Sequence, residues 1–230
     1  MGSVPMDTEA PFWSLLDATT RAALLHIGYI RQFPAKSTIL HQDDTSSYLL
    51  VLRRGCVKVI SCTEAGYPAV LAIRNAGDLL GEQGGLDGRP RSASLVALTD
   101  VTALVLPADR FATVLRERPG VGEAVRHVLS GRLREADRQR AATGSEAVRA
   151  RLASLLLDLA ERYGRRLGSG EVHILLPLSQ DDLAGLVLSS RRTVSRVLEQ
   201  WRNLSWVATG RHRIVISRPD ALKRQAAHDG

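Results

Sequence analysis

The sequence predicts an α+β protein in three parts: an antiparallel β-barrel, one long helix, and a helix-turn-helix that ends in a hairpin wing. Short Val-, Leu- and Ile-rich segments alternate with turn residues up to Pro107. A proline-free stretch with apolar residues every three or four positions follows Pro119. A capped helix pair and a hairpin pattern close the chain, so we place the boundaries at residues 5–118, 119–143 and 144–230.

Charge points to an anionic partner. The 230 residues include 31 Lys and Arg against 24 Asp and Glu, a net charge of +7. Residues 145–230 hold 14 of these basic and 9 of the acidic residues, a net of +5, whereas residues 1–144 hold 17 and 15, a net of +2. We therefore expect a nucleic-acid-binding part in the last third of the chain.

Two classes of protein are disfavoured by composition. No apolar segment approaches the roughly 20 residues needed to cross a bilayer, so we expect a cytoplasmic protein with no membrane partner. Cys56 and Cys62 lack the paired spacing of a zinc site and are too few to ligate an iron–sulfur cluster. We expect no metal site.

The first part begins with short helices, because apolar residues between Phe12 and Ile30 do not alternate as in a strand. The period then changes to that of strands bounded by Gly, Asp and Pro. The expected strands are 47–52, 56–62, 69–74, 93–98 and 101–106. A short helix over Asp109–Glu117 ends before Pro119.

The long helix runs to about Ala142 and carries a narrow apolar seam. The seam consists of Val121, Val125, Val128, Leu129, Leu133 and Ala136. Such a seam, flanked by arginines, predicts pairing with a second copy in a homodimer. The alternative is a helix packed against its own barrel. Thr143-Gly144-Ser145 indicates a hinge after the helix.

The third part opens with an apolar helix, Val148–Tyr163, which Gly164 ends. A loop of Arg, Gly and Ser leads to a short strand over 172–176. After two close-spaced helices, a hairpin joins residues 206–208 to residues 213–216.

The two close-spaced helices form the most informative pattern. Ser179 is a natural N-cap, and Asp181 and Asp182 suit the first turn. Ser189 or Ser190 caps the second helix. Its exposed N-terminal half presents Ser190, Arg191, Arg192, Ser195 and Arg196. Arginine can bind guanine bidentately or grip a phosphate, so we expect this helix to read double-stranded DNA in the major groove.

Phosphate contacts flank this helix in our interpretation. They are assigned to Ser179, Arg211 and Arg213.

Further motifs lie in the first part. Phe33 to His41 precedes the strands, and Arg53-Arg54-Gly55 turns between two of them. Gly77-Asp78 is followed by Gly81-Glu82 and, ten residues after Gly81, by Arg91-Ser92. With these motifs in this order, nearly the whole chain resembles the cyclic-nucleotide-responsive Crp/Fnr superfamily.

The resemblance implies a fold and a function. It implies a cyclic-nucleotide-binding type of barrel and a transcription regulator that acts as a homodimer on a palindromic DNA operator. It further implies a small-molecule effector, with cyclic AMP or cyclic GMP as candidates, and RNA polymerase as a partner.

The ligand-binding residues have a chemical rationale as well. An arginine with backbone N–H groups can neutralise a cyclic phosphate, and a glutamate can accept from a ribose hydroxyl. Gly81, Glu82, Arg91 and Ser92 are assigned these roles, and Gly81, Gly84 and Gly85 would let the backbone approach the ligand.

The long helix supplies two more candidates. Ala136 and Asp137 stand where the family's best-known member contacts the purine through adjacent hydroxyl residues. Ala136 cannot do so, while Asp137 could accept from a guanine edge or be a solvated helix residue.

Two residues of the helix-turn-helix differ from those usual in the family. Leu188 stands at the turn position that is usually glycine, and Arg192 stands where glutamate is common. Since glutamate suits cytosine and arginine suits guanine, we predict a different half-site.

Other functions stay open. The input could be haem, through a histidine, or a redox signal, or there could be none. A nucleotide-binding regulatory subunit of an enzyme would share the barrel but would leave the helix-turn-helix without a purpose. The chain has no nucleophile elbow, phosphate-binding loop or zinc-protease pair, so we do not expect an enzyme.

Overall fold

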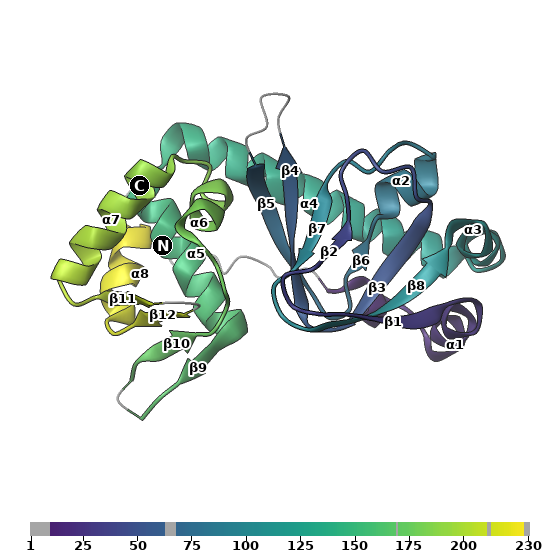
Figure 1. The fold of residues 1–230 in the computed structure, drawn as a ribbon, viewed down its shortest axis with the longest axis horizontal. Helices are drawn as coiled ribbons and strands as arrows, with labels where there is room; N and C mark the ends of the chain where they lie inside the picture. The colour runs from purple at the N-terminus through teal and green to yellow at the C-terminus, as the bar shows by residue number, and fades with distance from the viewer. Residues whose placement is uncertain (1–9, 63–67, 169, 211–212, 228–230) are drawn as a thin grey trace. The chain divides into compact units, whose positions relative to one another are not determined.

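The computed structural model describes residues 10–62, 68–168, 170–210 and 213–227. They fall into two compact units, one up to Arg134 and one from Glu135, with the division inside the long helix α4 (Pro119–Ser145). Figure 1 gives the order of the elements along the chain.

The first unit contains an antiparallel barrel of two four-stranded sheets. One sheet has the order β1-β8-β3-β6 and the other β2-β7-β4-β5. The strands are β1 (Tyr29–Phe33), β2 (Thr38–Leu40), β3 (Tyr48–Arg54), β4 (Cys56–Cys62), β5 (Pro68–Asn75), β6 (Leu79–Leu80), β7 (Ser94–Ala97) and β8 (Val101–Pro107).

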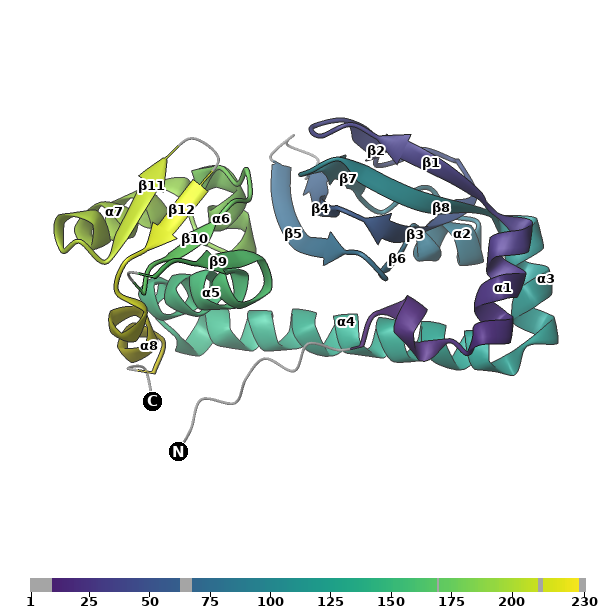
Figure 2. The same cartoon turned by 90° about the horizontal axis from the view of Figure 1, so that it is seen from below.

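Helices cover the outer face of the first sheet. They are η1 (Phe12–Leu15), α1 (Ala18–Ile27), α3 (Ala108–Glu117) and the first half of α4. Figures 1 and 2 show α1 and α3 side by side at one end of this unit. A short helix, α2 (Glu82–Asp87), follows β6.

The apolar run of strand β3 is continuous rather than alternating because both faces of the strand are covered. Leu50 and Leu52 pack into the core between the sheets, while Leu49 and Val51 pack against the helices outside. All four side chains are fully buried. Since successive strand residues face opposite sides, a strand covered on both faces needs apolar residues throughout.

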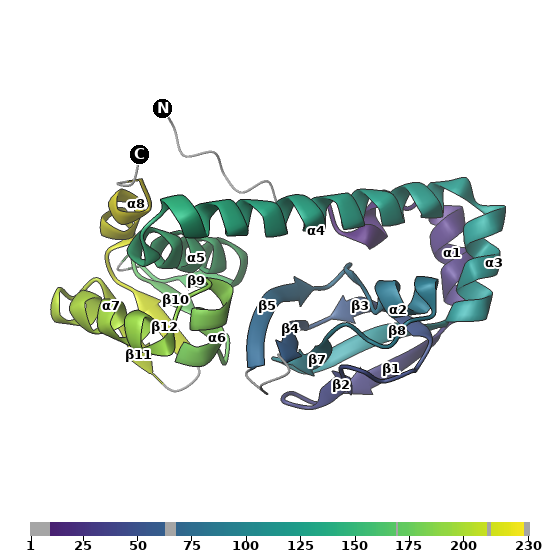
Figure 3. The same ribbon diagram turned by 90° about the horizontal axis from the view of Figure 1, so that it is seen from above.

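The second unit packs helices on one small sheet. The sheet has the order β11-β12-β10-β9. Its strands are β9 (Gly164–Arg166), β10 (Val172–Ile174), β11 (Val207–Gly210) and β12 (Arg213–Ile216), and its helices are α5 (Val148–Tyr163), α6 (Gln180–Leu186), α7 (Arg191–Asn203) and α8 (Pro219–Ala227). Figure 3 shows α8 against α5.

The α+β class and the order of parts are confirmed, and the bounds of β4 and α5 agree with prediction. The loop expected after Gly164 is wrong, because residues 164–166 form β9 at the edge of the sheet. Exposed Arg165 and Arg166 suit that edge, where charge discourages pairing with other chains.

The expected hinge at Thr143-Gly144-Ser145 lies inside α4. The helix continues because the Thr143 hydroxyl donates to the carbonyl of Gln139 and the backbone N–H of Glu146 donates to that of Ala142. The break comes after Ser145 instead. Among the described residues, no helix is both long and apolar enough to span a membrane.

Candidate ligand and nucleic-acid sites

Arg91 is the most buried charged side chain of the first unit, at 2% exposure. Backbone hydrogen bonds between Arg91 and residues 43 and 44 hold its chain segment. Its guanidinium donates to the carbonyl oxygens of Gly81, at 2.6 Å, and Tyr48, at 2.5 Å, and more weakly to Ser46 Oγ. Burial lowers the pKa of this guanidinium, and the charges of Tyr48 and nearby carboxylates oppose that shift. The predicted phosphate-binding arginine thus sits inside the fold, facing Gly81.

Glu82 is buried beside it, at 6% exposure, and is paired with a residue of the long helix. Arg132 Nη1 lies 2.7 Å from Glu82 Oε1, and Arg132 Nη2 donates to the carbonyl of Leu79. Two arginines therefore meet Glu82 at residues 79–82, and the Asp44 carboxylate also acts on the Arg91 charge.

The glycines of this segment lie close to other parts of the protein's own chain. A Cβ on Gly84 would lie 2.7 Å from the carbonyl oxygen of Arg89, and a Cβ on Gly85 would lie 2.8 Å from Leu49. Gly81 has a φ of +68° and faces the Arg91 guanidinium. They are needed because the protein's own chain packs closely here.

The other predicted ligand residues differ in exposure. Ser92 is exposed next to Arg91. Asp137 is exposed and pairs with Arg140 on its own helix, and Ala136 is half-buried.

The residues of the predicted dimer seam differ in burial. Val121, Val125 and Val128 are buried at 7% exposure or less in the core of their own unit. Leu129 packs against the same core. Leu133, 61% exposed, is the large apolar residue that α4 presents to solvent. The valines therefore pack on their own barrel, as the alternative expects, while pairing of the helix with a second copy stays a prediction.

The helix-turn-helix is fixed by caps at both helix starts. Ser179 and Asp182 form a reciprocal capping box on α6, and Asp182 is buried. Ser190, rather than Ser189, caps α7 by accepting from the backbone N–H of Thr193. The hydrophobic face of α7, with Val194, Leu198 and Trp201 among its buried residues, holds it in the fold.

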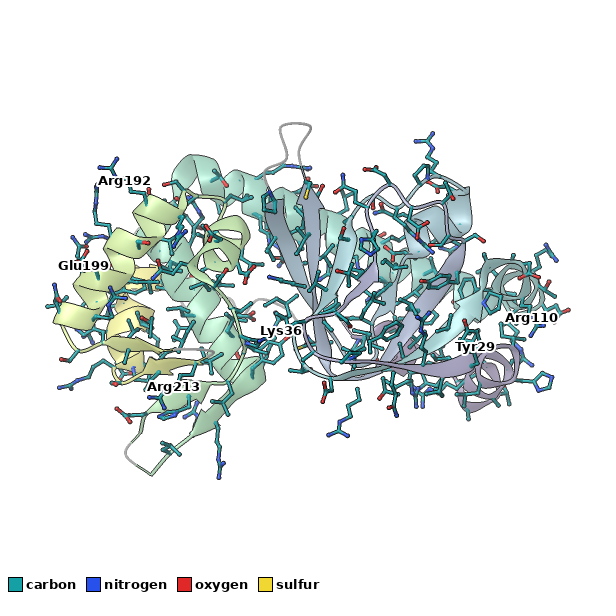
Figure 4. All side chains as sticks on the ribbon, in the orientation of Figure 1. Tyr29, Lys36, Arg110, Arg192, Glu199 and Arg213 are labelled. Carbon is teal, nitrogen blue, oxygen red and sulfur yellow. The ribbon has the colours of Figure 1, made fainter. Side chains whose placement is uncertain are left out.

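On the exposed side of α7, two predicted residues are engaged by α6. The Ser195 hydroxyl donates to Gln180 Oε1, and Arg191 Nη1 lies 3.5 Å from Asp181 Oδ2. Arg192 and Arg196 are exposed and have no hydrogen bond or ion pair to any described residue. Figure 4 shows Arg192 and Glu199 extending outward from α7. Arg192 and Arg196 line an open hollow on the helix surface together with Arg191, Ser195 and Glu199.

The wing is joined to α7 by Arg202, which donates to Thr209 Oγ1 on β11 at 3.0 Å. Arg213, labelled in Figure 4, is exposed at the start of β12. The predicted phosphate contact Arg211 lies outside the described residues.

Sequence reasoning missed two residues at these sites. Arg132 reads as one of several arginines beside the seam, and nothing in its neighbours distinguishes it from a solvated residue. Arg151 on α5 is likewise not distinguished from a solvated residue by its neighbours in the sequence. In both cases the partners are backbone carbonyls or distant side chains, which leave no local pattern.

Comparisons with known proteins cover both units. Residues 30–118 match the family model for the cyclic nucleotide-binding domain, and residues 150–225 match that for the Crp-like helix-turn-helix domain.

A cyclic AMP receptor protein from Thermus thermophilus is 34% identical over 73% of this chain and 74% of its own. A CRP-like cAMP-activated global transcriptional regulator from Mycobacterium tuberculosis is 29% identical over 84% of this chain and 86% of its own. The crystal structure of the Thermus thermophilus catabolite activator protein covers 96% of this chain and 100% of its own, at 28% identity and a TM-score of 0.53.

Proposed function

Because the chain belongs to the Crp/Fnr superfamily of transcription regulators, we propose that it binds a palindromic operator as a homodimer under the control of a cyclic nucleotide. Helix α7 would read the major groove of each half-site, and the exposed face of α4 around Leu133 would supply the dimer contact. RNA polymerase is the further partner in this proposal.

The DNA-binding part of the proposal rests on the exposure of the arginines on α7 and on their lack of partners among the described residues. Arg192 and Arg196 are four residues apart on one exposed face and unengaged by described residues. Four residues span about 6 Å along a helix, close to two base-pair steps of about 3.4 Å each. Each arginine could therefore address its own guanine through O6 and N7.

An operator obtained by selection from random DNA tests this part. Replacing Arg196 with Ala should weaken binding to that operator by about 1–3 kcal/mol and leave binding to unrelated DNA nearly unchanged. Arg224→Ala removes the same charge at an exposed position of α8 and serves as the control. An equal loss on all sequences would make Arg196 a phosphate contact and contradict base reading.

The cyclic-nucleotide input is supported by the match of residues 30–118 and by the buried guanidinium of Arg91 beside Gly81. In this proposal Arg91 and Ser92 hold the cyclic phosphate, and Glu82 accepts from the ribose hydroxyl. A bound cyclic phosphate would compete with the carbonyl oxygens of Gly81 and Tyr48 for Arg91. The relatives named for cyclic AMP favour that effector.

Isothermal titration with cyclic AMP and cyclic GMP tests the input. Binding should be saturable for wild type and weakened at least about tenfold in Arg91→Lys, which keeps the charge but loses the planar fork. Arg89→Ala, two residues away and exposed, is the matched control. Absence of heat with both nucleotides would overturn the cyclic-nucleotide input and leave the DNA-binding output standing.

A further inference from the structure

Arg151 lies in the first turns of α5 and reaches two other segments of its unit. Its Nε donates to the carbonyl oxygen of Val187 at 3.0 Å. Its Nη1 donates to the carbonyl oxygens of Ala142, at 3.3 Å, and Glu146. The side chain is half-buried, so these hydrogen bonds are partly shielded from water.

The carbonyl groups that Arg151 contacts lie at two helix C-terminal ends. Ala142 belongs to the last turn of α4 and Glu146 follows that helix, while Val187 is the C-cap of α6. The last carbonyls of a helix lack partners within it and carry partial negative charge. One guanidinium therefore contacts the C-terminal ends of α4 and α6 together, and at Ala142 it adds to the hydrogen bond that this carbonyl accepts from the Glu146 N–H.

The segment that Arg151 holds is the turn of the helix-turn-helix. The backbone N–H groups of residues 187, 188 and 189 all donate back into α6, to the carbonyl oxygens of Leu183, Gly185 and Ala184. The Val187 carbonyl accepts from Arg151 instead. Helix α7 starts directly after this turn and is tied to α6 through Ser195 and Gln180. Any movement of Val187 relative to the end of α4 would therefore move α6 and α7 as well.

We infer that Arg151 is a positioning residue that fixes the helix-turn-helix on the last turn of α4, and so sets the half-site spacing that the dimer accepts. The inference rests on the proposed function, in which two copies pair through α4 and bind a palindrome. Two recognition helices must then meet the major groove one helical turn apart, about 34 Å. An attachment that loosens would tolerate other spacings.

The test uses full-length protein and fluorescence anisotropy with the selected operator. A series of palindromes changes the spacing by one and two base pairs in each direction, and a further duplex carries a single half-site. Arg151→Ala, Arg151→Lys and the control Arg224→Ala are compared with wild type, and circular dichroism verifies that each is folded.

For wild type we expect a sharp optimum of spacing. In Arg151→Ala the preference for that optimum over the sites shifted by two base pairs should fall by about tenfold, since hydrogen bonds from a charged group are lost. Affinity for the single half-site should change less than about twofold, because α7 itself is intact. Arg151→Lys should lie between wild type and Arg151→Ala, and the control should match wild type.

A folded Arg151→Ala variant that weakens all spacings equally would overturn the inference and leave Arg151 a merely structural residue. A wild-type protein that binds a single half-site as tightly as the palindrome would instead overturn the dimeric operator, and this inference with it.

Discussion

The arginines of the barrel and those of helix α7 occupy opposite environments. Arg91 is buried at 2% exposure and donates to two backbone carbonyls and a hydroxyl of its own unit. Arg192 and Arg196 are exposed and have no partner among the described residues. The segment at residues 79–92 is closed by its own hydrogen bonds, whereas the exposed face of α7 is open to a partner.

This difference separates two kinds of consequence. A buried guanidinium cannot be removed without leaving its carbonyl partners unsatisfied, so changes at Arg91 affect folding as well as binding. An exposed arginine without a partner has little to do with stability, so changes at Arg192 affect recognition alone. A partner that binds Arg91 must therefore replace hydrogen bonds within the protein, whereas a partner that binds Arg192 need not.

The largest expected effect is on the stability of Arg91→Ala. Loss of its hydrogen bonds to Gly81, Tyr48 and Ser46 should lower the free energy of unfolding by about 2–3 kcal/mol. Arg192→Ala should change it by less than about 0.5 kcal/mol. Urea unfolding of both variants, followed by circular dichroism, measures the contrast; equal effects would remove the distinction between a closed and an open site.

A smaller effect is expected at Arg132. Its pair with Glu82 involves side chains that are 20% and 8% exposed, so Arg132→Ala leaves a buried carboxylate without its cation. We expect a loss of about 2 kcal/mol in the free energy of unfolding. Arg138→Ala breaks the more exposed pair with Glu135 on the same helix and should lose only about 0.3–0.5 kcal/mol. Similar losses in urea unfolding would mean that the Glu82 pair is effectively solvated.

The smallest effect concerns the turn before α7. Leu188 has a φ of +49° and its side chain is 42% exposed, so it is strained and contributes little burial. Leu188→Gly should stabilise the protein by about 1 kcal/mol or less, because glycine adopts this conformation freely but also loses more chain entropy on folding. A higher midpoint in thermal unfolding with unchanged operator affinity is the expected result; destabilisation would show that the leucine side chain is needed.

Local signals account for what the sequence could predict. Strand β4 and helix α5 follow from their apolar period and flanking glycines, and the start of α6 follows from the Ser179 cap. The burial of Val121, Val125 and Val128 could not be derived, because a helix face that suits a second copy also suits its own barrel. The same ambiguity hides Arg132 and Arg151, whose partners are 50 and 36 residues away.

The roles of the glycines are likewise only partly predictable from the sequence. The left-handed conformation of Gly81 is consistent with the turn that its neighbours indicate. The need for glycine at residues 84 and 85 arises from contacts with Arg89 and Leu49, which only the folded structure brings into view. A glycine-rich segment can therefore be located from sequence while the reason for its glycines cannot.

The most direct test of the account couples the two sites. Operator affinity of the full-length protein should be measured by fluorescence anisotropy in the absence and presence of saturating cyclic AMP or cyclic GMP. The account predicts that one of these nucleotides tightens operator binding by at least about tenfold, equivalent to a coupling free energy of about 1.4 kcal/mol, and that Arg91→Lys loses the effect. Unchanged affinity with both nucleotides would contradict a cyclic-nucleotide-controlled regulator.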